Sequence, residues 1–148
     1  NLPVICDIQP TFLTSDMPWV AEYIGSDRAQ YLYPFKTLLD KGVIMGGSSD
    51  APIEKVNLFL GIYALMTRED NGAVYNPEQI VSRFDAFKMY TVEAAKIVYR
   101  EHVQGEIKEG YFADFIVLDR DVMTVSPDKL KETKVLKTII DGEVVFEM

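Results

Sequence analysis

The stretch GGSSDAP, residues 46–52, follows directly on the apolar run of residues 43–45. A short apolar run that ends in glycine, serine and proline is typical of a buried strand followed by a turn. We therefore expect a strand over residues 43–47, with Asp50 just beyond its carboxyl end. A functional group at such a strand end is the arrangement that βα-barrels use for their active sites.

Asp50 has three interpretations. It can be a turn residue whose carboxylate satisfies local amides before Pro52, and spacing alone favours this reading. It can also be a chemically active group at a strand tip. A phosphate-binding loop is disfavoured, because an acid would repel phosphate and no G-x-G-x-x-G or Walker pattern is present.

The composition indicates one soluble globular unit with enough apolar residues for a core, since 48% of the 148 residues are hydrophobic. The net charge of −8 argues against nucleic acid or an anionic membrane as a partner, because both need a basic face. No apolar run reaches about 18 residues, so no membrane span is expected. Cys6 is the single cysteine, which excludes an internal disulfide and suits the reducing cytoplasm.

The first hundred residues alternate between expected strands and helices. The expected elements are a strand over 4–8, a loop over 11–25, a helix over 27–41, the strand over 43–47 and a helix capped by Asn57. Pro34 divides the helix over 27–41 or marks its true start, because proline interrupts a helix interior. Such an alternation predicts parallel βα units.

Further helices are expected before residue 105. Residues 69–75 read as a polar loop, and residues 76–79, Asn-Pro-Glu-Gln, read as a helix start with the asparagine as cap. Thr91 is expected to cap another helix, in which Ala94 and Ala95 allow a neighbour to approach closely.

The last 45 residues have a different pattern. Residues 107–118 read as two strands around the turn 108–110, and residues 135–146 read as a hairpin that turns at Asp141-Gly142. We therefore expect antiparallel strands here, so that two architectures meet near Gly105.

Four segments, in this order along the chain, carry a resemblance to a known family. They are DIQPTFLTSDMPWVAEYIGSDRA (7–29), GGSSDAPIEKVNLFLGIYALMTRED (46–70), GEIKEGYFADFIVLDRD (105–121) and VLKTIIDGEVVFEM (135–148). Together they resemble metal-dependent amidohydrolases of amidohydrolase family 3, in the subset of N-substituted formamide deformylase-like enzymes. The resemblance implies an α/β fold: the last two βα units of a TIM-type (β/α)8 barrel over residues 1–103, and part of a small antiparallel β-domain, a composite β-sandwich, over residues 104–148.

The resemblance also gives Asp50 a role. In the family, the acid at the tip of strand eight sits at the metal centre as general base: it takes a proton from metal-bound water and passes it to the leaving nitrogen. A divalent metal, zinc by this resemblance, lowers the pKa of such a water towards neutrality, and a carboxylate can then accept its proton. Gly46 and Gly47 are expected to remove side-chain bulk around this site.

Much of the family's machinery is not found in these 148 residues. The family's metal ligands are mainly histidines, whereas His102 is the single histidine here and, beside Glu101, is expected to be a surface residue. A zinc site needs at least three good ligands, and a barrel needs about 250 residues. Because the chain starts with Asn1 and not methionine, we expect a piece of a longer protein. Without the histidines, we expect this piece by itself to bind no metal and to be inactive. Strand edges and apolar helix faces without their barrel neighbours predict that it self-associates.

The resemblance marks three further residues as candidate substrate contacts: Asp16, Trp19 and Arg28 match positions that recur in the subset. The alternatives are that Trp19 is a packed anchor and Arg28 a surface charge. Arg68 is expected to be structural, and Cys6 to be a small core residue.

The resemblance implies hydrolysis of C–N bonds in small-molecule amides or N-formyl compounds. The alternative, from another functional class, is a non-catalytic binding or assembly module that kept the ends of the fold and lost its chemistry.

Overall fold

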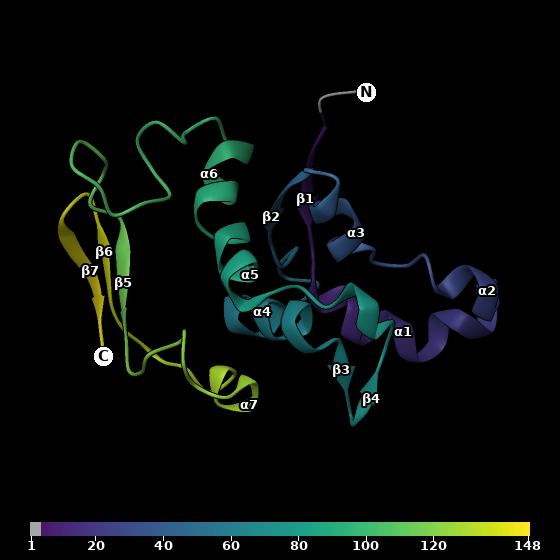
Figure 1. Cartoon of the computed structure of the whole chain (residues 1–148). Coiled ribbons are helices and arrows are strands. Elements are labelled where there is room, and N and C mark those ends of the chain that lie inside the picture. Colours follow the sequence, from purple (N-terminus) through teal and green to yellow (C-terminus); the bar gives the residue numbers. More distant parts are fainter. Residues whose placement is uncertain (1–3) are drawn as a thin grey trace.

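The computed structural model describes residues 4–148 of the chain. Its elements, in chain order, are β1 (Ile5–Ile8), α1 (Thr11–Ile24), α2 (Ser26–Ala29), α3 (Phe35–Asp40), β2 (Ile44–Gly47), α4 (Leu58–Thr67), β3 (Glu69–Asp70), β4 (Ala73–Val74), the 3-10 turn η1 (Pro77–Gln79), α5 (Arg83–Met89), α6 (Val92–Ile97), β5 (Phe115–Leu118), α7 (Pro127–Leu130), β6 (Val135–Ile140) and β7 (Glu143–Glu147). Figure 1 shows β1 and β2 among the first helices, and the sheet of β5, β6 and β7 on the far side of α5 and α6.

β1 and β2 form the expected parallel pair. Ile5 lies opposite Ile44 and Ile8 opposite Gly47, so the carboxyl ends of both strands meet at one edge. Parallel neighbours need a long crossover connection, which α1 to α3 provide. The α/β class is thus supported, whereas the assignment of these two strands to a (β/α)8 barrel stays a prediction.

The loop expected over residues 11–25 is wrong, because this segment forms the 14-residue helix α1. Leu13, Met17 and Val20 follow helical spacing and pack on the core. Burying each such side chain contributes about 1.5–3 kcal/mol, which together exceeds the roughly 3 kcal/mol that an interior proline costs. This explains why Pro18 is tolerated inside the helix.

Two of the expected helix boundaries are confirmed, and the cap expected at Thr91 is wrong. Asn57 caps α4, its Oδ1 accepting from the Phe59 N–H at 3.0 Å, and Pro34 separates α2 from α3. Thr91 precedes α6 without capping it, because its hydroxyl donates instead to the carbonyl of Phe87 at 3.0 Å.

The helix start expected at residues 76–79 is also wrong. Only the single turn η1 forms there, Asn76 has a left-handed φ of 48°, and the helix begins later, at Arg83. Val81 explains the delay: it is 1% exposed, and its N–H donates to the carbonyl of Leu65 at 2.9 Å. That tertiary bond keeps the chain extended until Ser82, whose Oγ accepts from the Asp85 N–H.

In two hairpins the turn consists of an Asn-Gly or Asp-Gly pair. Asp141 and Gly142 have φ values of 51° and 82°, which confirms the expected turn between β6 and β7. The loop expected over residues 69–75 is a short hairpin instead, and Asn71 and Gly72 have φ values of 49° and 86°.

The C-terminal sheet is antiparallel, as expected, in the order β5-β6-β7. The first strand expected within residues 107–118 is wrong, since only β5 forms there.

The segment between β5 and β6 packs on the first part of the chain. Leu130 of α7 is fully buried in the same core as Ile62 and Leu65 of α4. The Arg83 guanidinium donates to the carbonyls of Val122 and Val125, both at 2.6 Å. The sheet therefore stays tethered to the helices through this segment, and a domain division at residue 103 stays a prediction. Within residues 4–148, no helix is long and apolar enough to cross a membrane.

Candidate functional site

The carboxyl ends of β1 and β2 are held together by polar contacts. The Ser48 N–H donates to the carbonyl of Ile8 at 2.8 Å, and Gln9 Nε2 donates to Ser48 Oγ at 3.0 Å. The sequence analysis did not predict a role for Gln9, although its place directly after a strand is a signal for one. These bonds fix the first residue of the loop 48–57, which carries Asp50.

Asp50 lies on an exposed turn two residues beyond this contact. Its φ is 52°, a left-handed conformation that aspartate tolerates, and its carbonyl accepts from the Ile53 N–H at 2.9 Å. Within residues 4–148 its carboxylate has no hydrogen-bond or ion-pair partner. The backbone of Asp50 thus forms the turn, as the turn-residue interpretation expects, whereas its carboxylate remains available for other chemistry.

A cavity of 260 Å³ lies beside this loop, and we call it the strand-tip cavity. Ser48, Ser49, Asn57 and Tyr90 contribute polar side chains to its lining. Burial, and to a lesser extent the nearby charge of Asp7, raises the pKa of Tyr90, so its phenol stays neutral. The lining therefore offers neutral hydrogen-bonding groups, together with the cationic side chain of Lys55, next to the Asp50 turn.

The expectation that Gly46 and Gly47 clear space for a site is wrong, because that space is filled. A Cβ on Gly46 would lie 2.2 Å from Ile97 Cδ1 and 3.2 Å from Ala94 Cα, and one on Gly47 would lie 2.5 Å from the Tyr90 ring. The glycines let α6 and Tyr90 approach β2. The close approach expected at Ala94 is thereby confirmed.

Asp16 is already engaged within the fold. Its carboxylate accepts a hydrogen bond from the Tyr33 hydroxyl. Burial, followed by this bond and the charge of Asp16, raises the pKa of Tyr33.

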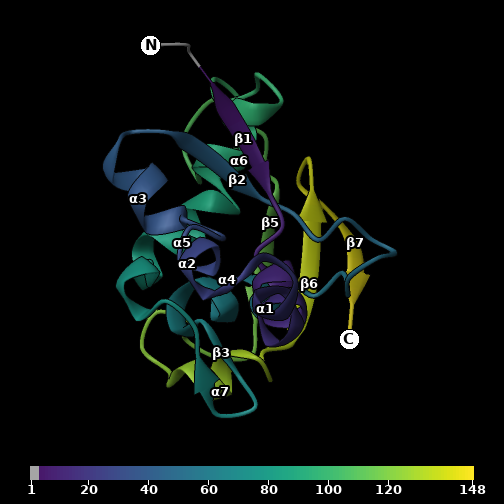
Figure 2. The ribbon, with the colours of Figure 1, turned by 90° about the vertical axis from the view of Figure 1, so that its right-hand side faces the viewer.

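Trp19 and Arg28 lie towards or beyond the outer end of α1. Trp19 is 49% exposed, donates from Nε1 to the carbonyl of Ser15 at 3.0 Å, and meets Tyr23 edge-on at 5.6 Å between ring centroids. Arg28 is exposed on α2, which Figure 1 places at the far end of α1 and Figure 2 shows nearest the viewer. A helix of this length spans about 20 Å, so Arg28 is not brought together with Asp50 within this chain. The substrate contacts of all three residues stay predictions.

The described residues do not by themselves fit a metal. Across residues 4–148, no group of three or more histidine, cysteine, aspartate or glutamate side chains lies close enough to hold an ion. His102 is exposed, with Nε2 at 3.7 Å from Glu101 Oε1. Asp50 offers one carboxylate, fewer than the three protein ligands of a zinc site.

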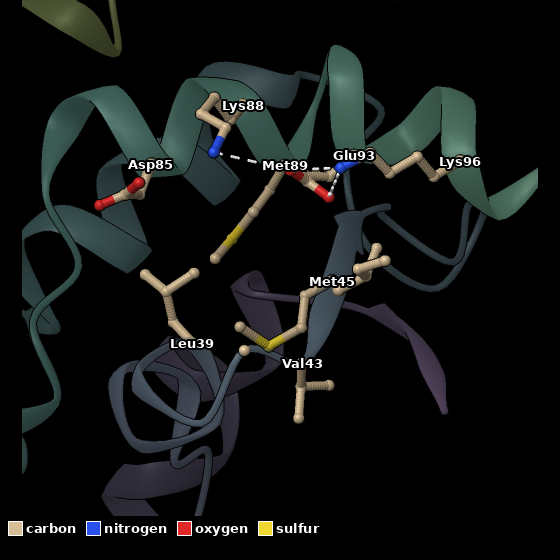
Figure 3. Close-up of a pocket in the computed structure, with 10 residues that line it drawn as sticks. Leu39, Val43, Met45, Asp85, Lys88, Met89, Glu93 and Lys96 are labelled. Atoms are coloured by element: carbon tan, nitrogen blue, oxygen red, sulfur yellow. Dashed lines mark hydrogen bonds and ion pairs between the residues drawn. The ribbon is translucent and has the colours of Figure 1, made fainter. Parts of the chain in front are cut away.

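A second cavity, of 240 Å³, lies beside the amino-terminal half of β2, and Asp50 does not line it. Figure 3 shows its lining residues. Apolar side chains line part of it, with Met45 and Met89 facing each other across it, and Asp85, Lys88, Glu93 and Lys96 complete the lining. On its rim Glu93 pairs with Lys96 at 3.0 Å and with Lys88 at 3.6 Å. Because these charges compensate one another, we assign this cavity to the packing of α5 and α6 on β2.

The sequence profile of the amidohydrolase family matches residues 1–146. YtcJ of Bacillus subtilis (strain 168), an amidohydrolase by name, is 41% identical over 99% of this chain and 28% of its own length. The N-substituted formamide deformylase of Arthrobacter pascens is 32% identical over 78% of this chain and 22% of its own.

A solved structure is similar as well. An uncharacterized metal-dependent hydrolase from Pyrococcus horikoshii OT3 superimposes with a TM-score of 0.76 at 31% identity, over 85% of this chain and 26% of that one. The chain thus spans about a quarter of the length of these relatives.

Proposed function

The chain belongs to the amidohydrolase family, and from this premise we propose that it is the C-terminal part of a metal-dependent hydrolase that cleaves C–N bonds in amides or N-formyl compounds. The observation that carries the proposal is the carboxylate of Asp50, which has no partner within residues 4–148, at the carboxyl end of a parallel βα unit. In barrel enzymes this end of the strands is where catalytic groups lie.

Asp50 is the proposed general base. It would accept a proton from the attacking water and return it to the nitrogen that leaves. A carboxylate that no other group of the described residues engages is free to make both transfers, and its turn is anchored to β1 through Ser48.

The divalent metal of the proposed enzyme, zinc by family resemblance, needs ligands from outside this chain, because the described residues do not provide a set of three. Asp50 would be the metal-site carboxylate contributed by this part. Asp16, Trp19 and Arg28 would border the substrate mouth, with Trp19 and Arg28 meeting only substrates that extend along α1. On this view the chain by itself is inactive.

The alternative proposal is a non-catalytic binding or assembly module. Under this proposal residues 4–148 would keep the ends of the fold without a metal-ligand set. The two proposals differ in what precedes residue 1: an upstream reading frame that encodes an H-x-H and later histidines supports the enzyme, and a natural start near Asn1 supports the module.

The decisive experiment compares Asp50→Asn with a matched control in the longer protein, on a panel of amides and N-formyl amines. The control is Asp141→Asn, since Asp141 is also an exposed aspartate with a left-handed φ, 51° against 52°, but lies in the β6–β7 turn. We expect Asp50→Asn to lower kcat by roughly 10²–10⁴-fold and Asp141→Asn to leave it unchanged. Near-normal turnover of Asp50→Asn would return Asp50 to the role of a turn residue.

A further inference from the structure

Tyr90 occupies space that two glycines leave open. A Cβ on Gly47 would lie 2.5 Å from Cε2 and Cζ of the Tyr90 ring, and a Cβ on Gly61 would lie 2.0 Å from its Oη. Contacts this short do not occur for real Cβ atoms, so both positions require glycine while Tyr90 is in place. The φ of neither glycine is left-handed, so close approach and not backbone conformation explains them.

These two glycines lie on the two flanks of the loop 48–57. Gly47 is the last residue of β2, and Gly61 belongs to α4, the helix that follows the loop. One aromatic ring, between α5 and α6, therefore contacts the segments on both sides of the turn that carries Asp50. The β1 side of the same loop is held independently, through Ser48.

We propose that Tyr90 is a positioning residue: its ring sets the separation between the end of β2 and α4, and thereby the place of the Asp50 carboxylate. This inference rests on the proposed function of Asp50. The positioning is steric, through the ring at Gly47 and through Oη at Gly61, because Tyr90 Oη has no hydrogen-bond partner within residues 4–148.

The geometry predicts a particular pattern of rescue. In Gly61→Ala the new methyl group meets Tyr90 Oη, and the close contact of the same ring with Gly47 limits how far the ring can move. Tyr90→Phe removes Oη, and the nearest ring atom is then Cζ at 3.0 Å, which requires a shift of only a few tenths of an ångström. Tyr90→Phe should therefore relieve Gly61→Ala. It should not relieve Gly47→Ala, which collides with Cε2 as well as with Cζ, both at 2.5 Å.

The test is a double-mutant cycle in the longer protein, with kcat and KM per metal-loaded site as the first readout. We expect Gly61→Ala to lower kcat by about 10–100-fold, with much less effect on KM, because a displacement of about 1 Å can have this effect on turnover. In the Tyr90→Phe background, the same substitution should change kcat by less than about twofold, within the usual additivity error. Gly47→Ala should lower kcat to a similar degree in both backgrounds.

Hydrogen exchange of the amides in residues 48–57 is the second readout, and it does not depend on activity. Gly61→Ala should speed exchange in this loop, and Tyr90→Phe should reverse the increase. The inference is overturned if Gly61→Ala acts equally in both backgrounds, or if loop exchange is unchanged. If the unsubstituted protein hydrolyses none of the amides, the proposed function fails, and the exchange cycle alone decides whether Tyr90 holds the loop.

Discussion

Arg68 offers the sharpest test of how the helical part is held together. The residue is fully buried, ends α4 with a left-handed φ of 52°, and has no carboxylate hydrogen-bonded to it within residues 4–148. Its Nε donates to the carbonyl of Tyr75 at 2.6 Å, and its Nη1 donates to that of Tyr33 at 2.9 Å. Burial lowers its pKa to about 10, so the guanidinium remains charged at neutral pH.

Arg68→Met keeps the volume of the side chain and removes these two donors, together with the longer bond from Nη2 to the carbonyl of Leu32 at 3.5 Å. Each carbonyl left buried without a donor costs about 1–3 kcal/mol, and removal of the buried charge offsets part of this loss. We therefore expect the free energy of unfolding to fall by about 2–4 kcal/mol, a large share of the 5–15 kcal/mol typical of a domain. Arg68→Lys should also destabilise, because one ammonium group cannot reproduce the planar fork that serves two separate carbonyls.

Urea unfolding followed by circular dichroism, at several protein concentrations, measures the change. Arg100→Met is the matched control, because Arg100 is exposed and its replacement should alter the free energy of unfolding by no more than about 0.5 kcal/mol. An Arg68→Met variant that stays within this margin would refute the view that these two bonds connect α4 to the Tyr33 and Tyr75 segments.

Four further outcomes are expected. Arg83→Met should speed hydrogen exchange in residues 119–126, because the carbonyls of Val122 and Val125 lose their donors at 2.6 Å. Unchanged exchange would show that Arg83 does not hold this segment in place. Hydrogen bonding to Arg120 lowers the pKa of Asp119 to about 2, so its stabilising effect is present above the unfolded pKa of about 4 and is lost as pH falls through about 2. Asp119→Asn should flatten the stability profile over that pH window, and an unchanged profile would contradict the assignment. The chain alone should bind no stoichiometric, chelator-resistant zinc after purification, as mass spectrometry can check, because its described residues lack a ligand set. It should also self-associate in sedimentation, since β7 is exposed and apolar over residues 144–146 with a free edge; a sharp monomer near 16.8 kDa would oppose this.

Local signals in the sequence were sufficient for several elements. The Asp141-Gly142 turn, the cap at Asn57 and the break at Pro34 depend on the conformational preferences of a few adjacent residues, which hold in almost any surroundings. The parallel strand pair followed from two short apolar runs separated by helix-length segments, because parallel strands need such a crossover. The position of Asp50 at a strand end followed from the same pattern.

Other features were decided by contacts between residues far apart in the sequence. Burial of Leu13 and Met17 stabilises a helix where the residues around Pro18 predict a loop. The bond from Val81 to α4 keeps the chain extended where Asn76 predicts the start of a helix. In both cases tertiary burial contributes more free energy than the local preference that opposes it.

The surroundings of the candidate site could not be read from the sequence for the same reason. Tyr90, whose ring lies against Gly47 and Gly61, is more than 25 positions from either glycine in the sequence. Tyr33, whose carbonyl accepts from Arg68, is 35 positions from it. A glycine in the sequence carries no sign of which atom fills the space beside it. The sequence alone thus determined the βα unit, the terminal hairpin and the place of the Asp50 carboxylate, whereas tertiary packing decided which side chains hold that carboxylate in position.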